Sequence, residues 1–416
     1  MVASSLTILL LIGAARFGTE LGLGADYSSQ QYWPSLYDTL EPGSQSDTVN
    51  VETEARGSLS LSLDISPEAG RGFEARNYLG FSTRSLRDRL ELAFRGDIAS
   101  WLGLQVADET EFKVYHSLVP TADTLYSTDH VANSGRLQLD VRPGEALTFS
   151  VWDRVQLYHY PEPDSYTYDY SLNELGLGVR RQFGLISEAD ADYTWSRRYA
   201  GDQSYTGHDL DVGLDWYSDA GPVIGLSGDL SRRSYAAREW SYLELGPGIS
   251  FNGDFTDYLS LDFSNESRWT WHDSASSVHR DVFANTARLS LDARLGSNLT
   301  LHAGPQHELE RGLPKPNNDD YRELAFVSGL DLLVARRLWL SFEDRLGRRR
   351  YPLADSSLQT NYAFNEVNIF LDWTVLSGRA GSIVLDGMVS ISPEWHARQT
   401  DNFSTRIYTL ELKYRF

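Results

Sequence analysis

The sequence predicts an all-β protein, and more narrowly a transmembrane, antiparallel, up-and-down β-barrel. Three observations support this fold. Apolar and polar residues alternate along most of the chain, short turns and longer polar loops follow one another in order, and tryptophans gather near the predicted strand ends. Period-two alternation is the signature of a strand with one apolar and one polar face.

The alternation is clearest in five segments of the chain. In the first, Leu59, Leu61, Leu63 and Ile65 stand between serines and Asp64. The other four cover residues 137–141, 210–216, 289–295 and 367–375. Each segment places its apolar side chains on one face of an extended strand and its charged or hydroxyl side chains on the other.

Turns and loops divide these segments into hairpins. Short turns are indicated at Arg142–Glu145, Ser218–Gly221, Leu295–Asn298 and Ser377–Ala380, with weaker signals near Gly96–Asp97, Gly184, Gly253–Asp254 and Arg336–Arg337. Longer polar loops are indicated at Ser28–Asp47, Leu118–His130, Pro161–Tyr166, His272–His279, Gly312–Asp319 and Pro352–Gln359. The short turns recur about every 40 residues, which holds two strands of ~10–15 residues and one loop. We therefore expect about 20 strands, within a range of about 18–22.

Two-faced strands also build soluble sandwiches, propellers and solenoids, in which the apolar face points into a core. Two further patterns favour a membrane barrel, whose apolar face points into lipid. Short turns at one end and long polar loops at the other are typical of such barrels, and closure leaves no exposed strand edge. Tryptophans near both strand ends fit two interfacial girdles: Trp101, Trp216, Trp339 and Trp373 near the turns, and Trp195, Trp240, Trp269, Trp271 and Trp395 near the loops. A soluble β-protein is the alternative.

The composition narrows the possible functions. The net charge of −21 argues against nucleic-acid binding, which needs a basic surface to neutralise phosphates. The chain has no cysteine, which excludes disulfides, thiolate metal sites and cysteine nucleophiles. The mean hydropathy is −0.38, and no run reaches the ~18 consecutive apolar residues that a transmembrane helix needs.

The amino-terminal segment differs from the remainder of the chain. Residues 6–15 are largely apolar, and Gly13 and Ala15 give a small-x-small pattern. This is the length and pattern of a signal peptide, so we expect residues 1–15 to be cleaved after Ala15. Residues 16–416 are then expected to form one transmembrane barrel without a second domain.

The polar face is rich in ionisable residues, and in a barrel that face lines the interior. We predict that the following residues line the lumen: Arg154, Arg180, Asp209, Asp211, Arg288, Asp292, Arg294, Asp331, Asp372 and Asp386. A loose repeat also occurs near loops, as WSRRYAG at Trp195, LSRRSYA at Leu230 and LGRRRYP at Leu346. Three residues depart from the pattern, because Pro247 falls inside a strand and Asp153 and Asp344 fall on its apolar face.

The chain ends in a strand of perfect alternation that closes on an aromatic residue. Its apolar positions are Tyr408, Leu410, Leu412, Tyr414 and Phe416. This ending resembles the C-terminal β-signal of bacterial outer-membrane β-barrel proteins. The resemblance implies location in the outer membrane of a Gram-negative bacterium, contact with its lipid, and recognition by the barrel-assembly machinery. We also expect this strand to pair with the segment near Phe17–Tyr27 and seal the barrel.

No catalytic motif accompanies the strands. The sequence holds no G-x-S-x-G, H-E-x-x-H or C-x-x-C motif and no phosphate-binding loop before a helix. His302 and His307 have an odd spacing, which places them on opposite faces of a regular strand and disfavours a shared metal. We therefore expect no enzymatic activity, metal or cofactor.

The resemblance favours a porin-like channel for passive diffusion of small polar solutes, with selectivity set by lumen size and by the placement of arginines and carboxylates. A non-conducting structural barrel, or a component of surface export or assembly, is the alternative. An outer-membrane enzyme is the least favoured hypothesis. The solute and the oligomeric state are left open at this point.

Overall fold

The structure is a computed structural model, and it describes residues 15–32, 48–68, 71–82, 85–115, 129–161, 169–184, 186–218, 221–236, 240–274, 279–315, 319–335, 337–353, 360–378, 381–397 and 402–415. These residues form one sheet of 20 strands. The strands are β1 (Ala15–Tyr32), β2 (Thr48–Glu68), β3 (Arg71–Ser82), β4 (Ser85–Ala99), β5 (Leu102–Tyr115), β6 (His130–Gly144), β7 (Leu147–His159), β8 (Tyr170–Phe183), β9 (Ser187–Tyr199), β10 (Tyr205–Tyr217), β11 (Val223–Tyr235), β12 (Tyr242–Thr256), β13 (Leu259–His272), β14 (Asp281–Arg294), β15 (Leu299–Leu313), β16 (Tyr321–Val334), β17 (Leu338–Arg350), β18 (Tyr362–Gly378), β19 (Gly381–His396) and β20 (Phe403–Arg415).

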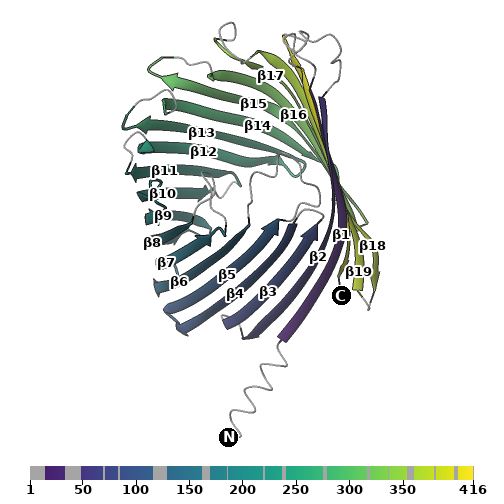
Figure 1. The fold of residues 1–416 in the computed structure, drawn as a ribbon. Coiled ribbons are helices and arrows are strands. Elements are labelled where there is room, and N and C mark those ends of the chain that lie inside the picture. Colours follow the sequence, from purple (N-terminus) through teal and green to yellow (C-terminus); the bar gives the residue numbers. More distant parts are fainter. Residues whose placement is uncertain are drawn as a thin grey trace.

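The sheet closes on itself. Each strand pairs antiparallel with the strands before and after it in sequence, and β1 pairs with both β2 and β20. In Figure 1 the purple first strand runs beside the yellow carboxy-terminal strands, which completes the wall. The predicted up-and-down antiparallel β-barrel and its predicted number of strands are therefore confirmed.

The two ends of the barrel differ in their connections. From β2–β3 to β18–β19, every second connection has two to five residues, and we call this side the turn end. The opposite side, the loop end, has connections of five to 15 residues, apart from the two-residue connection between β3 and β4. The predicted asymmetry is present. Because strands can run past a glycine, the turns expected near Gly96 and Gly253 instead lie at Ser100–Trp101 and Asp257–Tyr258.

Alternate residues of each strand lie on the outer and inner faces of the closed wall. The outer face carries large apolar side chains that are exposed, among them Leu61, Phe81, Leu157, Leu177 and Phe326. The inner face carries charged and hydroxyl side chains that converge across neighbouring strands. Such an outer face suits hydrocarbon, because lipid solvates apolar side chains and the closed ring of paired strands leaves no open sheet edge.

Pro247, Asp153 and Asp344 departed from the sequence pattern, and the structure shows where each of them lies. Pro247 lies in β12, and the pairing with β13 skips Gly246 and Pro247, so its missing N–H leaves a gap in the ladder. Asp153 does lie on the outer face, where its Oδ1 accepts a hydrogen bond of 3.2 Å from Asn173. Asp344 also lies on the outer face, opposite Ser328.

The tryptophans follow the predicted girdles in part. Trp216 and Trp373 at the turn end and Trp271 and Trp395 at the loop end are exposed on the outer face. Trp339 differs, because its register partner is Asp372 of the inner face. Trp240 does not lie in a strand. It precedes β12, and its ring lies 6.1 Å from that of Tyr235.

The last strand seals the barrel as expected. The register joins Tyr27 to Tyr408 and Leu21 to Tyr414 across β1 and β20. Tyr408, Leu410 and Leu412 are exposed on the outer face at 37%, 54% and 49%. Phe416 and residues 1–14 of the expected signal peptide lie outside the described residues.

Within the part of the chain that the structure describes, no helix is long and apolar enough to cross a membrane.

Candidate functional site: the inner wall of the barrel

All ten residues predicted from sequence to line the lumen have inner-face positions. Strand register pairs each of them with other inner-face residues on the neighbouring strands. The alternation of side chains along a regular strand is enough to explain why all ten lie on the inner face. The residues are Arg154, Arg180, Asp209, Asp211, Arg288, Asp292, Arg294, Asp331, Asp372 and Asp386. Whether solutes pass along them stays a prediction.

Most of the predicted arginines form ion pairs with carboxylates that the sequence analysis did not single out. The pairs join Arg154 to Glu174 at 3.7 Å, Arg180 to Glu188 at 3.0 Å, and Arg294 to Asp254 at 3.3 Å. Asp372 and Asp386 are direct cross-strand neighbours, and Lys413 Nζ lies 2.7 Å from Asp386. Much of the inner charge is therefore neutralised locally between adjacent strands.

Three aspartates on β9, β10 and β11 form an exception, which we call the acidic row. Asp211 is the direct cross-strand partner of both Asp192 and Asp229. Like charges in facing positions repel one another. The carboxylates at the two ends of the row each lie over a glycine of the next strand. Asp192 lies over Gly178 and Asp229 over Gly246, where a Cβ atom would collide with them. The missing side chains let these carboxylates spread apart.

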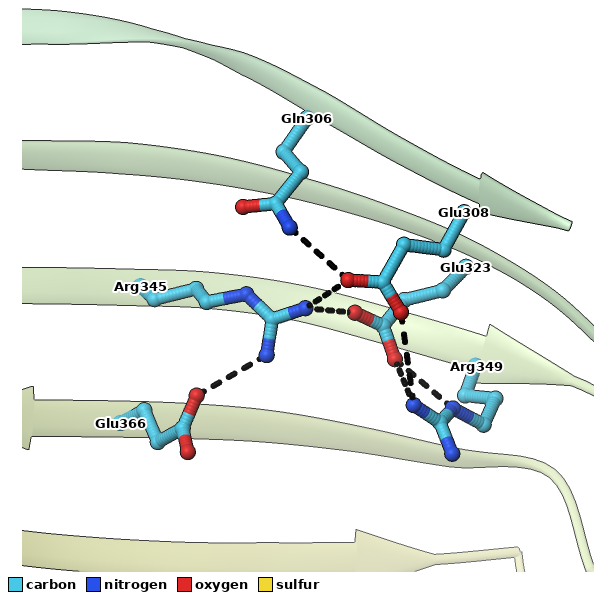
Figure 2. A network of polar contacts seen from close by, with 6 residues as sticks. All are labelled: Gln306, Glu308, Glu323, Arg345, Arg349 and Glu366. Atoms are coloured by element: carbon cyan, nitrogen blue, oxygen red, sulfur yellow. Dashed lines mark hydrogen bonds and ion pairs between the residues drawn. The ribbon is translucent and has the colours of Figure 1, made fainter. Parts of the chain in front are cut away.

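A charge network on β15–β18 is centred on a buried carboxylate (Figure 2). Glu323, with its side chain 2% exposed, accepts hydrogen bonds from Arg345 and from Arg349, the latter at 2.7 Å. Arg345 also lies 3.1 Å from Glu308 and 2.9 Å from Glu366. Arg345 thus spans from β17 across β16 to β15. Two guanidinium groups are held by three carboxylates, so the network carries excess negative charge.

Tyrosines line the inner face close to the loop end, and we call them the tyrosine belt. The rings of Tyr158 and Tyr170 stack at 4.5 Å, and those of Tyr205 and Tyr235 lie 5.2 Å apart. The ring of Tyr362 lies 4.8 Å from that of His396. The belt consists of Tyr158, Tyr170, Tyr205, Tyr235, Tyr242, Tyr321 and Tyr362.

Just outside the strands, a loop contact fixes the ends of β7 and β8. Asp169 accepts hydrogen bonds from the Tyr160 backbone N–H at 2.8 Å and lies 2.9 Å from His159 Nδ1. The backbone N–H first, and then His159, hold the pKa of the Asp169 carboxyl below its usual value. This carboxylate therefore remains charged throughout the neutral range.

Two cavities lie in the wall. One of about 650 Å³ is lined by several predicted residues, including Arg288, Asp292 and Asp331, together with His302 and Glu343. A second of about 350 Å³ lies where the β12–β13 ladder is interrupted. His302 is on the inner face and His307 on the outer, as their spacing predicted. Among the described residues, no group of three or more His, Asp or Glu side chains is placed to hold a metal ion.

Sequence reasoning missed Glu323 and Arg345 at the centre of the network, and it noted Arg349 only as part of the LGRRRYP repeat. Each lies at a polar position of an alternating strand, which is a signal that the sequence does contain. Their mutual contact depends on the register between β16 and β17, which pairs Glu323 directly with Arg349. The acidic row was found in part, through Asp211, but Asp192 and Asp229 were not.

No protein-family model and no curated protein match the sequence. Solved structures do match its fold. The FrpB iron transporter from Neisseria meningitidis superposes with a TM-score of 0.63 at 12% identity, over 98% of this chain and 83% of that one. The siderophore receptor PirA from Pseudomonas aeruginosa gives 0.55 at 8% identity, over 96% and 80%. OccAB4 from Acinetobacter baumannii gives 0.53 at 10% identity, over 96% and 98%.

At identities of this size, the similarity establishes the fold. This chain has the architecture of an outer-membrane β-barrel, the fold that its repeated strands and its ending predicted. The superposed proteins include an iron transporter, a siderophore receptor and OccAB4, which matches this chain over 98% of its length. What the barrel does must be argued from its own inner wall.

Proposed function

We propose that the protein is a porin-like channel of the bacterial outer membrane, through which small polar solutes diffuse passively. The proposal rests above all on the inner wall, which is lined with ionisable and hydroxyl side chains around the ring of strands. Polar side chains on that face keep water and polar solutes in favourable contact.

The size of the ring supports the same function. Barrels of about 16–18 strands leave an aqueous channel, whereas those of about eight are filled by their own side chains. This ring has 20 strands. The similarity in fold to OccAB4 over nearly its whole length also favours a channel, although the low identity leaves the solute to be found by experiment.

The acidic row and the excess carboxylates of the β15–β18 network favour passage of cations over anions. Carboxylates outnumber lysines and arginines on the described part of the inner wall. Fixed charges on a water-filled wall attract counter-ions over a Debye length of about 10 Å at 0.1 M salt. Selectivity in this channel is therefore electrostatic and weakens as salt rises. No residue is assigned a catalytic step, and no cofactor is needed.

A non-conducting barrel for surface export or assembly is a second candidate. The observation that favours it is the pairing of inner charges. Arg154, Arg180 and Arg345 each form an ion pair with a glutamate on a neighbouring strand. Charges satisfied in this way could belong to an interior that passes no current. In either function, the barrel contacts outer-membrane lipid and reaches the membrane through the barrel-assembly machinery.

Planar-bilayer recording of the purified, refolded protein separates these functions. A channel gives stepwise currents, and a tenfold KCl gradient across the bilayer gives a reversal potential of the sign expected for cation preference. Folding is checked in the same preparation by gel migration before and after boiling. Protein that shows the heat-dependent shift of a folded barrel but no current would reject the channel.

A further inference from the structure

The Arg-Arg repeats singled out in the sequence all lie near the loop ends of odd-numbered strands, β9, β11 and β17. In each repeat, successive arginines lie on opposite faces of the wall. The inner arginine of each repeat stacks on the tyrosine belt: Arg198 over Tyr170 at 4.3 Å, Arg233 over Tyr205 at 5.3 Å, and Arg349 over Tyr321 at 4.1 Å. The inner arginines thus have a structural role, and the outer ones need a separate explanation.

The outer arginines are concentrated on β15–β17. Arg348 and Arg350 lie on the outer face of β17, and Arg322 of β16 is the direct cross-strand partner of Arg350. Arg311 adds a fourth on the outer face of β15. All four side chains are exposed. We call Arg311, Arg322, Arg348 and Arg350 the outer arginine cluster.

This cluster has no counter-ion in the part of the chain that the structure describes. None of its four arginines forms an ion pair with a described carboxylate, and the hydrogen bond from Arg322 goes to His307 at 3.2 Å. The outer arginine of the β11 repeat differs, because Arg232 donates two hydrogen bonds to Asp273, at 2.7 and 2.5 Å. Like charges directly opposite on a sheet are destabilising, so a bound anion would relieve the repulsion between these arginines.

The cluster also lies where the apolar outer surface ends. On the same face, one step toward the turn end, Leu324, Phe326 and Leu346 are exposed at 56%, 53% and 56%. Leu324 is the direct cross-strand partner of Arg348. Arginines at the edge of a lipid-facing surface place their guanidinium groups at the level of the lipid headgroups.

The outer arginines are unequally divided between the two ends of the barrel. Among strand residues whose side chains the structure describes, Arg181 is the one outer-face arginine near the turn end. Arg197, Arg232 and Arg406 join the cluster at the loop end. The anion is therefore expected in the leaflet next to the long loops.

We propose that the outer arginine cluster binds the phosphorylated headgroups of lipids in that leaflet. A guanidinium group donates paired N–H bonds that match two oxygens of a phosphate, and such charge-assisted bonds are about twice as strong as neutral ones. Arg322, Arg348 and Arg350 lie on adjoining positions of two strands, so a headgroup with more than one phosphate can engage several of them. Binding of this kind is independent of whether the lumen conducts.

The test uses the full chain refolded in octyl glucoside, whose headgroup has no charge. Dihexanoyl phosphatidylinositol 4,5-bisphosphate, a soluble lipid with several phosphates, is titrated and its Kd measured by calorimetry. The double variant R322Q/R350Q is expected to bind at least about tenfold more weakly than the native chain. The matched control R232Q removes an outer arginine that already has a carboxylate partner, and its Kd is expected to be unchanged.

Two further ligands identify the source of the phosphate. Dihexanoyl phosphatidylcholine, whose headgroup is zwitterionic, should bind much more weakly than the bisphosphate lipid. Inorganic phosphate should fail to displace that lipid at equal concentration. Equal binding by the native chain and R322Q/R350Q, equal affinity for the two lipids, or displacement by phosphate at equal concentration would each overturn the proposal. Both variants must show the heat-dependent gel shift of a folded barrel, which is expected because the substituted side chains are exposed.

Discussion

Replacement of Glu323 by glutamine should destabilise the barrel more than any comparable change of an inner-wall carboxylate. Glu323 lies at the centre of the β15–β18 network, with its side chain 2% exposed and each oxygen facing a different guanidinium group (Figure 2). Glutamine keeps one acceptor but turns its NH₂ group, a donor, toward the other arginine. One charge-assisted hydrogen bond is lost and the second is weakened.

The magnitude follows from these contacts. A hydrogen bond to a charged group contributes about 1.5–3 kcal/mol, and a neutral acceptor roughly halves that value. Removing one partner of a buried ion pair costs about 3–5 kcal/mol when nothing else neutralises the remaining charge. Here Glu308 and Glu366 still lie within 3.1 Å and 2.9 Å of Arg345. We therefore expect E323Q to lower the free energy of unfolding by roughly 2–3 kcal/mol.

Urea unfolding of the protein in lipid vesicles, followed by tryptophan fluorescence and by gel migration without boiling, measures this change. The control is E343Q, because Glu343 is 39% exposed and lies 3.9 Å from His302. Such a pair contributes at most about 1 kcal/mol. Adding R349Q to E323Q should cost less than the sum of the two single changes. If E323Q unfolds at the same urea concentration as E343Q, the network does not have the role assigned to it.

Three other predictions concern the acidic row, Phe416 and Asp169. Asparagine at all three positions of the acidic row should lower the ratio of K⁺ to Cl⁻ permeability, with a larger change at 0.1 M than at 1 M salt; an unchanged reversal potential would remove the row from selectivity. Deleting Phe416 should lower the amount of barrel inserted in cells while leaving refolding in detergent intact; normal membrane levels would argue against an assembly signal. The lowered pKa of Asp169 means that its bond to the Tyr160 N–H is present above the ordinary carboxyl value of 3.8 and is lost as pH falls through the lowered pKa. Protection of that amide from hydrogen exchange should disappear in the same acidic range, whereas D169N, whose side chain does not titrate, should show no such loss over that range.

The fold was predictable from sequence because its information is local. Alternation within single strands, as from Leu59 to Ile65, gives both the strand and its two faces. Turn positions were less predictable where the turn lacks a glycine or proline signal. Ser100–Trp101 is such a turn, and the nearby Gly96 and Asp97 lie inside β4. A two-residue hairpin turn is recognised in sequence mainly by pairs such as Asn-Gly or Asp-Gly, and Ser100–Trp101 has no residue of this kind.

The residues of the inner wall could be predicted one by one, but the contacts between them could not. Each predicted position, such as Arg180 or Asp292, lies on the inner face because strand parity is set within a few residues. The contacts between them require register, and register joins positions far apart in sequence, such as Arg345 and Glu308. For the same reason, Asp209 and Asp211 were found, whereas the facing partners of Asp211 were not.

The pairing of β1 with β20 makes the order of strands in the chain independent of their order in the wall. Every other neighbouring pair is joined by a connecting segment, whereas this seam pairs the first strand with the last. Glu20 and Arg415 are cross-strand partners at the turn end, so a short linker could join the two ends there. Opening the chain at another turn would then give a circular permutant with every strand pairing retained. In the natural chain, β20 both closes the wall and carries the aromatic ending. The permutant would keep the closing pairing while β20 no longer stood at the end of the chain.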